Sequence, residues 1–490
     1  MEVISSVLNW FSSNILQNPA FFVGLLVLIG YALLKKPAHD VFSGFVKATV
    51  GYMLLNVGAG GLVTTFRPIL AALNYKFQIG AAVIDPYFGL AAANNKIAAE
   101  FPDFVGTATT ALLIGFGVNI LLVALRKITK VRTLFITGHI MVQQAATVSL
   151  MVLFLVPQLR NAYGTAAIGI ICGLYWAVSS NMTVEATQRL TGGGGFAIGH
   201  QQQFAIWFVD KVAGRFGKKE ESLDNLKLPK FLSIFHDTVV ASATLMLVFF
   251  GAILLILGPD IMSNKEVITS GTLFNPAKQD FFMYIIQTAF TFSVYLFVLM
   301  QGVRMFVSEL TNAFQGISNK LLPGSFPAVD VAASYGFGSP NAVTVGFLFG
   351  VLGQIVAILG LIVFKSPVLI ITGFVPVFFD NATFAVYANH KGGLRAASIL
   401  SFLSGLIQVL GGAVAAGAFG LAAYGGWHGN FDWDTIWVGF GFLMQNFQYI
   451  GLGIVLLILL VIPQLQYSKN KEHYFTIAED YETYLESKQN

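Results

Sequence analysis

The feature that most constrains this chain is a series of long apolar runs. A helix that crosses a bilayer needs about 20 mostly apolar residues, and we predict eleven such spans. They cover residues 17–34, 42–64, 105–125, 133–158, 162–183, 238–258, 280–303, 341–364, 367–388, 396–424 and 436–463. Of the 490 residues, 56% are hydrophobic and only 11% are charged, whereas roughly 25% are charged in a typical soluble domain. The sequence therefore predicts an all-α polytopic membrane protein.

Three connecting segments do not read as ordinary loops. Residues 68–104, 190–208 and 305–340 mix apolar residues with Gly, Pro, Gln and Asp. They are too polar to span a bilayer as helices and too apolar to be solvent-exposed loops. Irregular backbone at membrane depth is tolerated where it lines a cavity inside the protein, so we expect re-entrant or interfacial segments here.

The basic residues predict the orientation of the chain, because Lys and Arg accumulate in cytoplasmic segments. If the N-terminus lies outside, eleven spans place 21 of the 28 Lys and Arg inside and 7 outside. Residues 126–132, the loop 209–236 and the tail from Lys469 are then cytoplasmic. The segment 425–435 has no Lys or Arg and two Trp, which is typical of an outer loop at the membrane interface.

An internal repeat is visible at an offset of 235 residues. The segment LLIGFGVNILLVALRKITKVRTLFI at 112–136 resembles FLFGVLGQIVAILGLIVFKSPVLII at 347–371, and ThrGly follows both. A weaker match aligns Asp85 with Asp330. Five spans per copy is an odd number, so the copies would be inverted relative to each other, as in many transporters. Chance similarity between apolar segments is the alternative.

Several function classes are excluded by composition. A formal charge of +4 is too small and too scattered for nucleic acid. The single cysteine, Cys172, excludes a disulfide framework and a thiolate metal site. The N-terminus has neither a basic region nor a small-residue cleavage site, so we expect no removable signal peptide. We expect no cofactor and no resident metal.

Polar residues at membrane depth are costly and usually functional. On a helix, His139 and Gln143 are i, i+4 neighbours and face the same way. His200 opens the run HisGlnGlnGln at 200–203 after four consecutive Gly residues. Amide side chains both donate and accept hydrogen bonds, which suits hydroxyl groups. A lone His at a helix end is often only structural, but here both His residues lie beside Gln in interrupted segments.

Two further segments combine Pro with Asp. They are Asp85-Pro86-Tyr87 and the run 327–330, which ends at Asp330. Pro interrupts a helix and frees backbone groups for a ligand. The four segments together hold no Lys or Arg, so they suit a polyhydroxylated ligand with at most one delocalised negative charge. Asp380-Asn381 could be either cavity wall or structure.

The motif TGHIMVQQ, followed by GGGGFAIGHQQQFA and KKEESLDNLKLPKFLSIFHD, resembles a known family. It is similar to the membrane-embedded IIC permease of the bacterial ascorbate-specific phosphotransferase system (PTS). The stretches at 301–318 and 378–390 resemble it as well. The resemblance covers nearly the whole chain and is weakest at 259–279 and in the tail.

This resemblance implies a function and an architecture. The family imports L-ascorbate through the bacterial inner membrane, and a cytoplasmic IIB subunit phosphorylates it with a phosphoryl group from IIA. The IIC subunit is a homodimer in the lipid bilayer, performs no phosphoryl chemistry itself, and moves a core domain against a scaffold. The implied division is scaffold at 1–66 and 236–304, core at 67–235 and 305–435, and a last helix with a cytoplasmic tail at 436–490.

The resemblance also implies the solute contacts. Carried over by motif, they are Pro86, Tyr87, His139, Ile140, Met141, Val142, Gln143, His200, Gln201 and Asp330. Other members commonly have Thr where Pro86 stands, so one side-chain hydroxyl contact is lost here. Ascorbate is a monoanion at neutral pH, and the His and Gln donors suit its ring oxygens. We expect Asp330 at the hydroxylated tail and the two His nearer the ring.

Rival hypotheses remain open. An ion-coupled secondary transporter of a small polar or anionic solute would equally use inverted repeats and buried Asp and His. An intramembrane enzyme would need an activated nucleophile or a metal. His139, His200 and Asp330 could together hold a metal, but nothing in their spacing fixes a ligand set.

Overall fold

The structure, a computed structural model, describes residues 18–489 except 79, 228, 230, 233–236, 270, 272, 323 and 324. Eight described helices are long and apolar enough to cross a membrane, and two shorter apolar helices lie at Val23–Leu33 and Ser242–Leu257. The chain is therefore a mostly helical multi-pass membrane protein, as predicted. The count of eleven spans stays a prediction, and residues 1–17, at the predicted outer N-terminus, lie outside the described residues.

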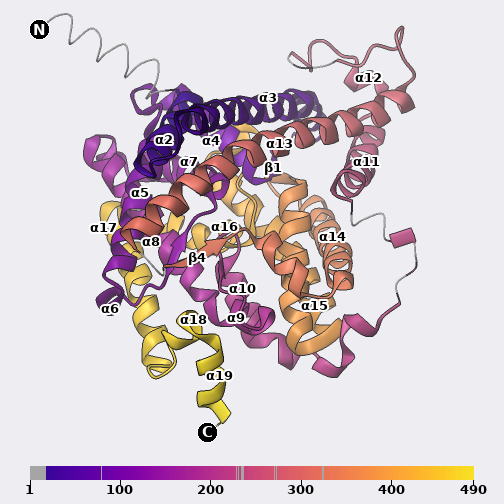
Figure 1. Cartoon of the computed structure of the whole chain (residues 1–490). Helices are drawn as coiled ribbons and strands as arrows, with labels where there is room; N and C mark the ends of the chain where they lie inside the picture. The colour runs from indigo at the N-terminus through magenta and orange to yellow at the C-terminus, as the bar shows by residue number, and fades with distance from the viewer. Residues whose placement is uncertain are drawn as a thin grey trace, which may run out of the picture.

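One group of helices forms an elongated layer along one side of the molecule. It consists of α2 (Pro19–Leu33), α3 (Ala38–Phe77), α11 (Thr238–Leu257) and α13 (Phe281–Leu321). Figure 1 shows α3 and α13 running beside each other across this layer, and α13 also packs on α2 and α11. A side chain at Gly58 would overlap the backbone of Leu299. Small residues here let the two long helices approach closely, as in many membrane bundles.

The remaining long helices form the main body. In the first half, α5 (Thr107–Ala124) packs on α7 (Gly138–Leu155) and α8 (Ala162–Met182). In the second half, α14 (Pro340–Val363) packs on α15 (Asn381–Ala418). Gly393, at φ 61°, bends α15, because a residue without a Cβ adopts positive φ without strain. The predicted spans 367–388 and 396–424 both overlap this bent helix.

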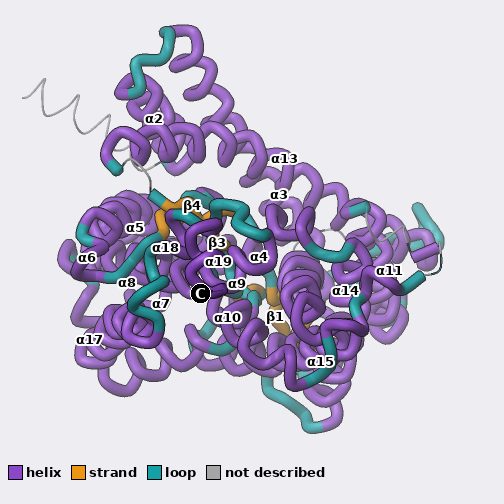
Figure 2. Tube along the Cα trace, turned by 60° about the horizontal axis from the view of Figure 1, so that its bottom comes forward, coloured by secondary structure: helices purple, strands orange, loops and turns teal. Residues whose placement is uncertain are grey.

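In the described part of the chain, six short strands lie inside the helical body, and Figure 2 shows their place among the helices. They are β1 (Gly80–Ile84), β2 (Thr133–Phe135), β3 (Ala197–Ile198), β4 (Phe326–Val329), β5 (Val368–Thr372) and β6 (Gly426–Trp427). All pairs are parallel, in two sheets ordered β5-β1-β6 and β2-β4-β3. Each sheet thus inserts a strand from one half of the chain between two strands of the other half. The segments predicted at 68–104, 190–208 and 305–340 contain β1, β3 and β4.

Shorter helices connect these parts. They are α4 (Pro86–Glu100), α6 (Arg126–Thr129), α9 (Val184–Thr191), α10 (Gln203–Val212), α12 (Pro259–Met262), α16 (Phe431–Asp434), α18 (Thr476–Glu479) and α19 (Tyr481–Gln489). The last long helix, α17 (Ile436–Lys469), precedes the tail. The expected boundaries at 66/67 and 304/305 fall inside α3 and α13, so neither marks a break in the chain's helices.

One expectation about the segment 425–435 is wrong. It is not an outer loop at the membrane interface, because Trp427, His428, Asp432 and Trp433 are fully buried. The Asp432 carboxylate accepts from the backbone N–H of Phe204 at 2.9 Å. The segment lacks Lys and Arg because it packs in the interior, where contacts with distant residues satisfy several of its polar groups.

Candidate functional site

A cavity of about 680 Å³ lies beside α13, between segments from the first and the second half of the chain. Six of the ten predicted contact residues line it: Tyr87, His139, Ile140, Gln143, His200 and Asp330. The other lining residues are Met300, Arg304, Ala332, Tyr335, Gly336, Pro340, Val343, Val375, Phe378 and Phe379. This volume is within the usual range of small-molecule sites, roughly 300–1,000 Å³.

The strands explain why residues far apart in sequence meet here. The carboxyl ends of parallel strands lie at the same edge of a sheet. Asp330 directly follows β4, while His139 follows β2 and His200 follows β3 by a few residues. In the other sheet, Asp85 and Tyr87 follow β1, and Val375 follows β5. The fold thus gathers one group of residues from each sheet edge around the cavity.

His139 and Asp330 form a partly exposed pair. The His139 Nε2 lies 3.3 Å from Asp330 Oδ2, with the side chains 14% and 37% exposed. The buried Nδ1 of His139 has no hydrogen-bond partner among the described residues. Asp330 Oδ1 accepts from the backbone N–H of Ala332 at 2.9 Å and so caps the 3₁₀ segment η8 (Val331–Phe337). Asp330 and His139 are therefore neighbours and do not occupy opposite ends of the site.

His200 is almost fully buried and is held in one orientation. Its Nδ1 lies 2.7 Å from Gln202 Oε1. Because an amide oxygen only accepts hydrogen bonds, Nδ1 carries the proton in this assignment. A neutral His200 then presents Nε2 as an acceptor, and only the protonated ring donates from that atom. The rings of His139 and His200 lie 6.4 Å apart at 73°.

Buried amides support the cavity wall from behind. Gln201 Nε2 donates to Gln143 Oε1 at 2.8 Å. Gln201 Oε1 accepts from Gln144 Nε2 at 2.7 Å and lies 2.8 Å from His428 Nε2. His428 stacks on Trp433 with ring centroids 4.0 Å apart. The amide of Gln143 is therefore fixed by a buried network that reaches the interior segment 425–435.

Four predicted contact residues do not line this cavity. Gln201 is fully buried behind Gln143, and Met141 is fully buried in α7. Val142 lines a different cavity. Pro86 begins α4, so it shapes the backbone beside Tyr87. For these four, a direct solute contact stays a prediction.

Sequence reasoning missed several lining residues. Arg304, on α13, places a guanidinium in the wall of a site that was expected to lack basic residues. The signal was present, because an Arg at the end of a predicted span is itself a candidate for function. Tyr335 and Phe378 carried no such signal, since aromatic residues are frequent in this chain.

Two other acidic residues have structural partners. Asp85 caps α4 by accepting from the backbone N–H of Tyr87 at 3.0 Å, and it also accepts from Val375 N at 3.2 Å. Asp380 is fully buried and accepts from Phe431 N and Gln408 Nε2, both at 2.7 Å. Of the two interpretations of Asp380, the structure supports the structural one.

His139, His200 and Asp330 could also offer ligands to a metal. Their ligand atoms all lie within 4.8 Å of one another. Two imidazole nitrogens and a carboxylate form a known set for Zn²⁺. The same atoms equally suit an anionic, hydroxylated solute, so the trio alone does not select a metal.

Comparison with known proteins agrees with this architecture. Residues 14–434 match the family model EIIC-GAT, described as the PTS system sugar-specific permease component. A relative in Mycoplasma pneumoniae (strain ATCC 29342 / M129 / Subtype 1), described as the ascorbate-specific PTS system EIIC component, is 37% identical over 427 residues. The alignment covers 81% of this chain but only 64% of that relative's length. The resemblance found in the sequence motifs is thereby confirmed at the level of the family. The chain belongs to the EIIC-GAT family of sugar-specific PTS permease components.

Proposed function

We propose that this chain is the membrane subunit that imports L-ascorbate, coupled to phosphorylation of the solute by a cytoplasmic IIB subunit that is supplied by IIA. The observation that carries the proposal is the cavity in which His139, His200 and Asp330 converge beside Tyr87 and Gln143. The name of the Mycoplasma relative points to the same solute.

The chemistry of the cavity suits a hydroxylated monoanion. Arg304 supplies one fixed positive charge, and the unpartnered Nδ1 of His139 offers a further polar contact. The exposed carboxylate of Asp330 accepts hydrogen bonds from hydroxyl groups. Charge-assisted hydrogen bonds of this kind are stronger than neutral ones, which favours an acidic sugar derivative over a neutral hexose.

We further propose an inverted repeat of five plus five spans, followed by an eleventh. The exchange of β1 and β4 between the two sheets supports it, because each half contributes the same pattern of one central and two flanking strands. The proposed scaffold comprises α2, α3, α11 and α13. The proposed core comprises the remaining elements up to residue 435, without the last helix and the tail at 436–490, and would move as a rigid body against the scaffold.

We place the protein as a homodimer in the bacterial inner membrane, with the N-terminus outside. An apolar stripe on α3 formed by Val46, Val50, Met53 and Val57 is exposed and offers the scaffold a surface for a second copy. The cytoplasmic segment around Lys219 packs on the bend of α15, since a side chain at Gly393 would meet the carbonyl of Lys218. This firmly held segment is our proposed docking region for IIB.

An ion-coupled secondary transporter is the alternative. The His139–Asp330 pair is the observation that favours this alternative, because such a pair can bind and release a proton. The two functions differ in the product: a PTS permease delivers phosphorylated solute to the cytoplasm, whereas an ion-coupled transporter delivers unmodified solute.

The proposal is tested by ligand binding to purified protein. L-ascorbate should raise the melting temperature, whereas glucose, a neutral hexitol and citrate should leave it unchanged. A shift with a neutral sugar and none with ascorbate would contradict the proposed solute.

A further inference from the structure

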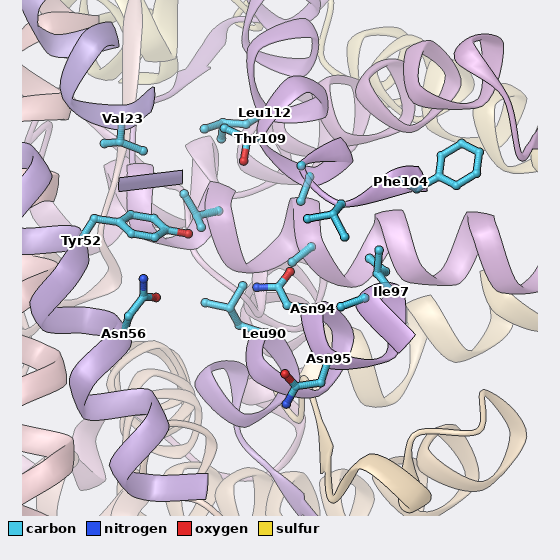
Figure 3. A pocket seen from close by; sticks show the side chains of 16 residues that line it. Val23, Tyr52, Asn56, Leu90, Asn94, Asn95, Ile97, Phe104, Thr109 and Leu112 are labelled. Carbon is cyan, nitrogen blue, oxygen red and sulfur yellow. The ribbon is translucent and has the colours of Figure 1, made fainter. Parts of the chain in front are cut away.

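A second polar cavity lies against a different face of α7 from the solute site. It holds about 320 Å³ between α2 and α3 on one side and α4, α5 and α7 on the other. Ile140 and Gln143 of α7 line the solute cavity, whereas Val142 and Ala146 line this one. Figure 3 shows Tyr52 and Asn94 pointing into the same space.

The second cavity occupies the place in the first half that the solute cavity occupies in the second. From the second half, α13, η8 and α14 line the solute cavity; from the first half, α3, α4 and α5 line the second cavity, and α4 and α7 contribute to both. Ala108 of α5 and Val343 of α14 are separated by the repeat offset of 235 residues, and each lines its own cavity. The two cavities are therefore counterparts under the proposed repeat.

Its polar side chains need an explanation in a membrane protein. The side chains of Asn56, Asn94 and Asn95 are exposed and line the cavity, and none of these amides hydrogen-bonds to another side chain in the part of the chain that the structure describes. An amide facing hydrocarbon is costly, so such residues face water or a ligand. Amides also match the hydroxyl groups of an uncharged or weakly charged solute.

A continuous helix face joins this cavity to the solute site. Tyr87, Leu90 and Asn94 lie at i, i+3 and i+7 on α4, which places them on one face. Tyr87 lines the solute cavity, and Leu90 and Asn94 line the second. Seven residues of helix span about 10 Å. This face of α4 therefore leads from the solute cavity at Tyr87 to the second cavity at Asn94.

The polar lining continues away from the solute site. A neighbouring cavity of about 350 Å³ shares Asn56, Asn94 and Asn95 and adds Arg67. Arg67 and Asn95 also line a fourth cavity, which includes Glu266 of the segment after α12. In the proposed orientation this segment lies outside, so the groove leads outward. The solute cavity instead includes Pro340, the first residue of α14, whose start lies on the cytoplasmic side.

We infer that this groove is the outer section of the solute route, with Asn94 and Asn95 lining it when the core has moved along the scaffold. The inference rests on the proposed function. In the present arrangement the solute site joins the cavity of the second half. After the movement it would join the groove of the first half, which Asn94 and Asn95 line and Arg67 borders.

Accessibility of Asn94 tests the inference. Cys172 is buried in α8, so the Asn94→Cys variant carries one accessible thiol. A membrane-impermeant methanethiosulfonate, added outside sealed right-side-out vesicles, should label it, and saturating ascorbate should change the labelling rate at least fivefold. The matched control is Asn275→Cys in the predicted outer segment after α12, an exposed asparagine that lines none of these cavities; its labelling rate should not respond to ascorbate.

A second variant separates the route from the binding site. Asn94→Leu should reduce ascorbate uptake at least tenfold while ascorbate affinity of the purified protein stays within twofold. Absence of outside labelling, or an unchanged uptake rate, would overturn the inference and identify the groove as a lipid-filled crevice. Wild-type protein that neither binds nor takes up ascorbate would instead overturn the proposed function.

Discussion

The two carboxylate oxygens of Asp330 contact different partners, and this separates its structural and binding roles. Oδ1 caps η8, and Oδ2 faces His139 and the cavity. Asn is as effective an N-cap as Asp, so Asp330→Asn should keep the cap. In this variant, the side-chain NH₂ group would face solute hydroxyl groups, and both would be hydrogen-bond donors.

We therefore expect Asp330→Asn to leave the melting temperature unchanged and to weaken ascorbate binding. An unpaired polar group in a closed site costs about 1–3 kcal/mol, equivalent to a factor of about 5 to 150 in affinity. Calorimetric titration checks this, with an analogue lacking the tail hydroxyls as control, which should bind as it does to wild type. Lower stability with equal losses for both ligands would make Asp330 a cap only.

Gln143 and Gln201 permit a matched comparison. Gln143→Ala removes a group from the cavity wall, whereas Gln201→Ala removes the side chain that holds it and leaves Gln144 and His428 each without a partner. We expect both variants to weaken ascorbate binding, and Gln201→Ala to lower the melting temperature more. An unchanged ascorbate affinity in Gln201→Ala would contradict the proposal that Gln201 holds Gln143 in place.

Residue chemistry made part of the site predictable. His139 and Gln143 were identified because their spacing places them on one helix face, and the structure has both in the cavity wall. The role of Gln201 as a support could not be predicted, because His428 lies 227 residues away in sequence. Arg304 was overlooked although its position at the end of an apolar span was visible.

At the scale of elements, the close crossing of α3 and α13 depends on glycine. A side chain at Gly58 would overlap Leu299, whereas one at Gly60 would meet nothing within 4 Å. Overpacking costs about 1–3 kcal/mol, while Ala in an open helix position gains roughly 0.5–1 kcal/mol over Gly.

We therefore predict that Gly58→Ala lowers the melting temperature and that Gly60→Ala leaves it unchanged or raises it. Thermal unfolding of the purified protein in one detergent measures both. Equal shifts in the two variants would show that the crossing is looser than described.

The helices were predictable and the strands were not. A run of about 20 apolar residues is sufficient to indicate a membrane helix. A buried strand of two to five residues inside such a run has no periodicity of its own. The sequence therefore predicts membrane helix where the structure has β2, at the start of the span 133–158, and where it has β5, in the span 367–388. The strands form only because distant segments such as β4 and β1 satisfy their backbone groups.

At the scale of the whole molecule, the orientation can be tested separately from the solute. Reporter fusions at residue 220, beside η5 (Lys219–Glu221), and after residue 490 should both report the cytoplasm. We expect this result because Lys and Arg accumulate in cytoplasmic segments, and the predicted orientation places most of the Lys and Arg of this chain on that side. Reports from opposite sides would mean that the number of spans between the two positions is odd.

Transport by purified components tests the central claim most directly. Proteoliposomes would contain this chain, with IIB, IIA and a phosphoryl donor enclosed, and labelled L-ascorbate would be added outside. We predict that phosphorylated ascorbate accumulates inside, and that omitting IIB abolishes the accumulation. Concentration of unmodified ascorbate without IIB, driven by a proton or sodium gradient, would contradict the account and establish a secondary transporter.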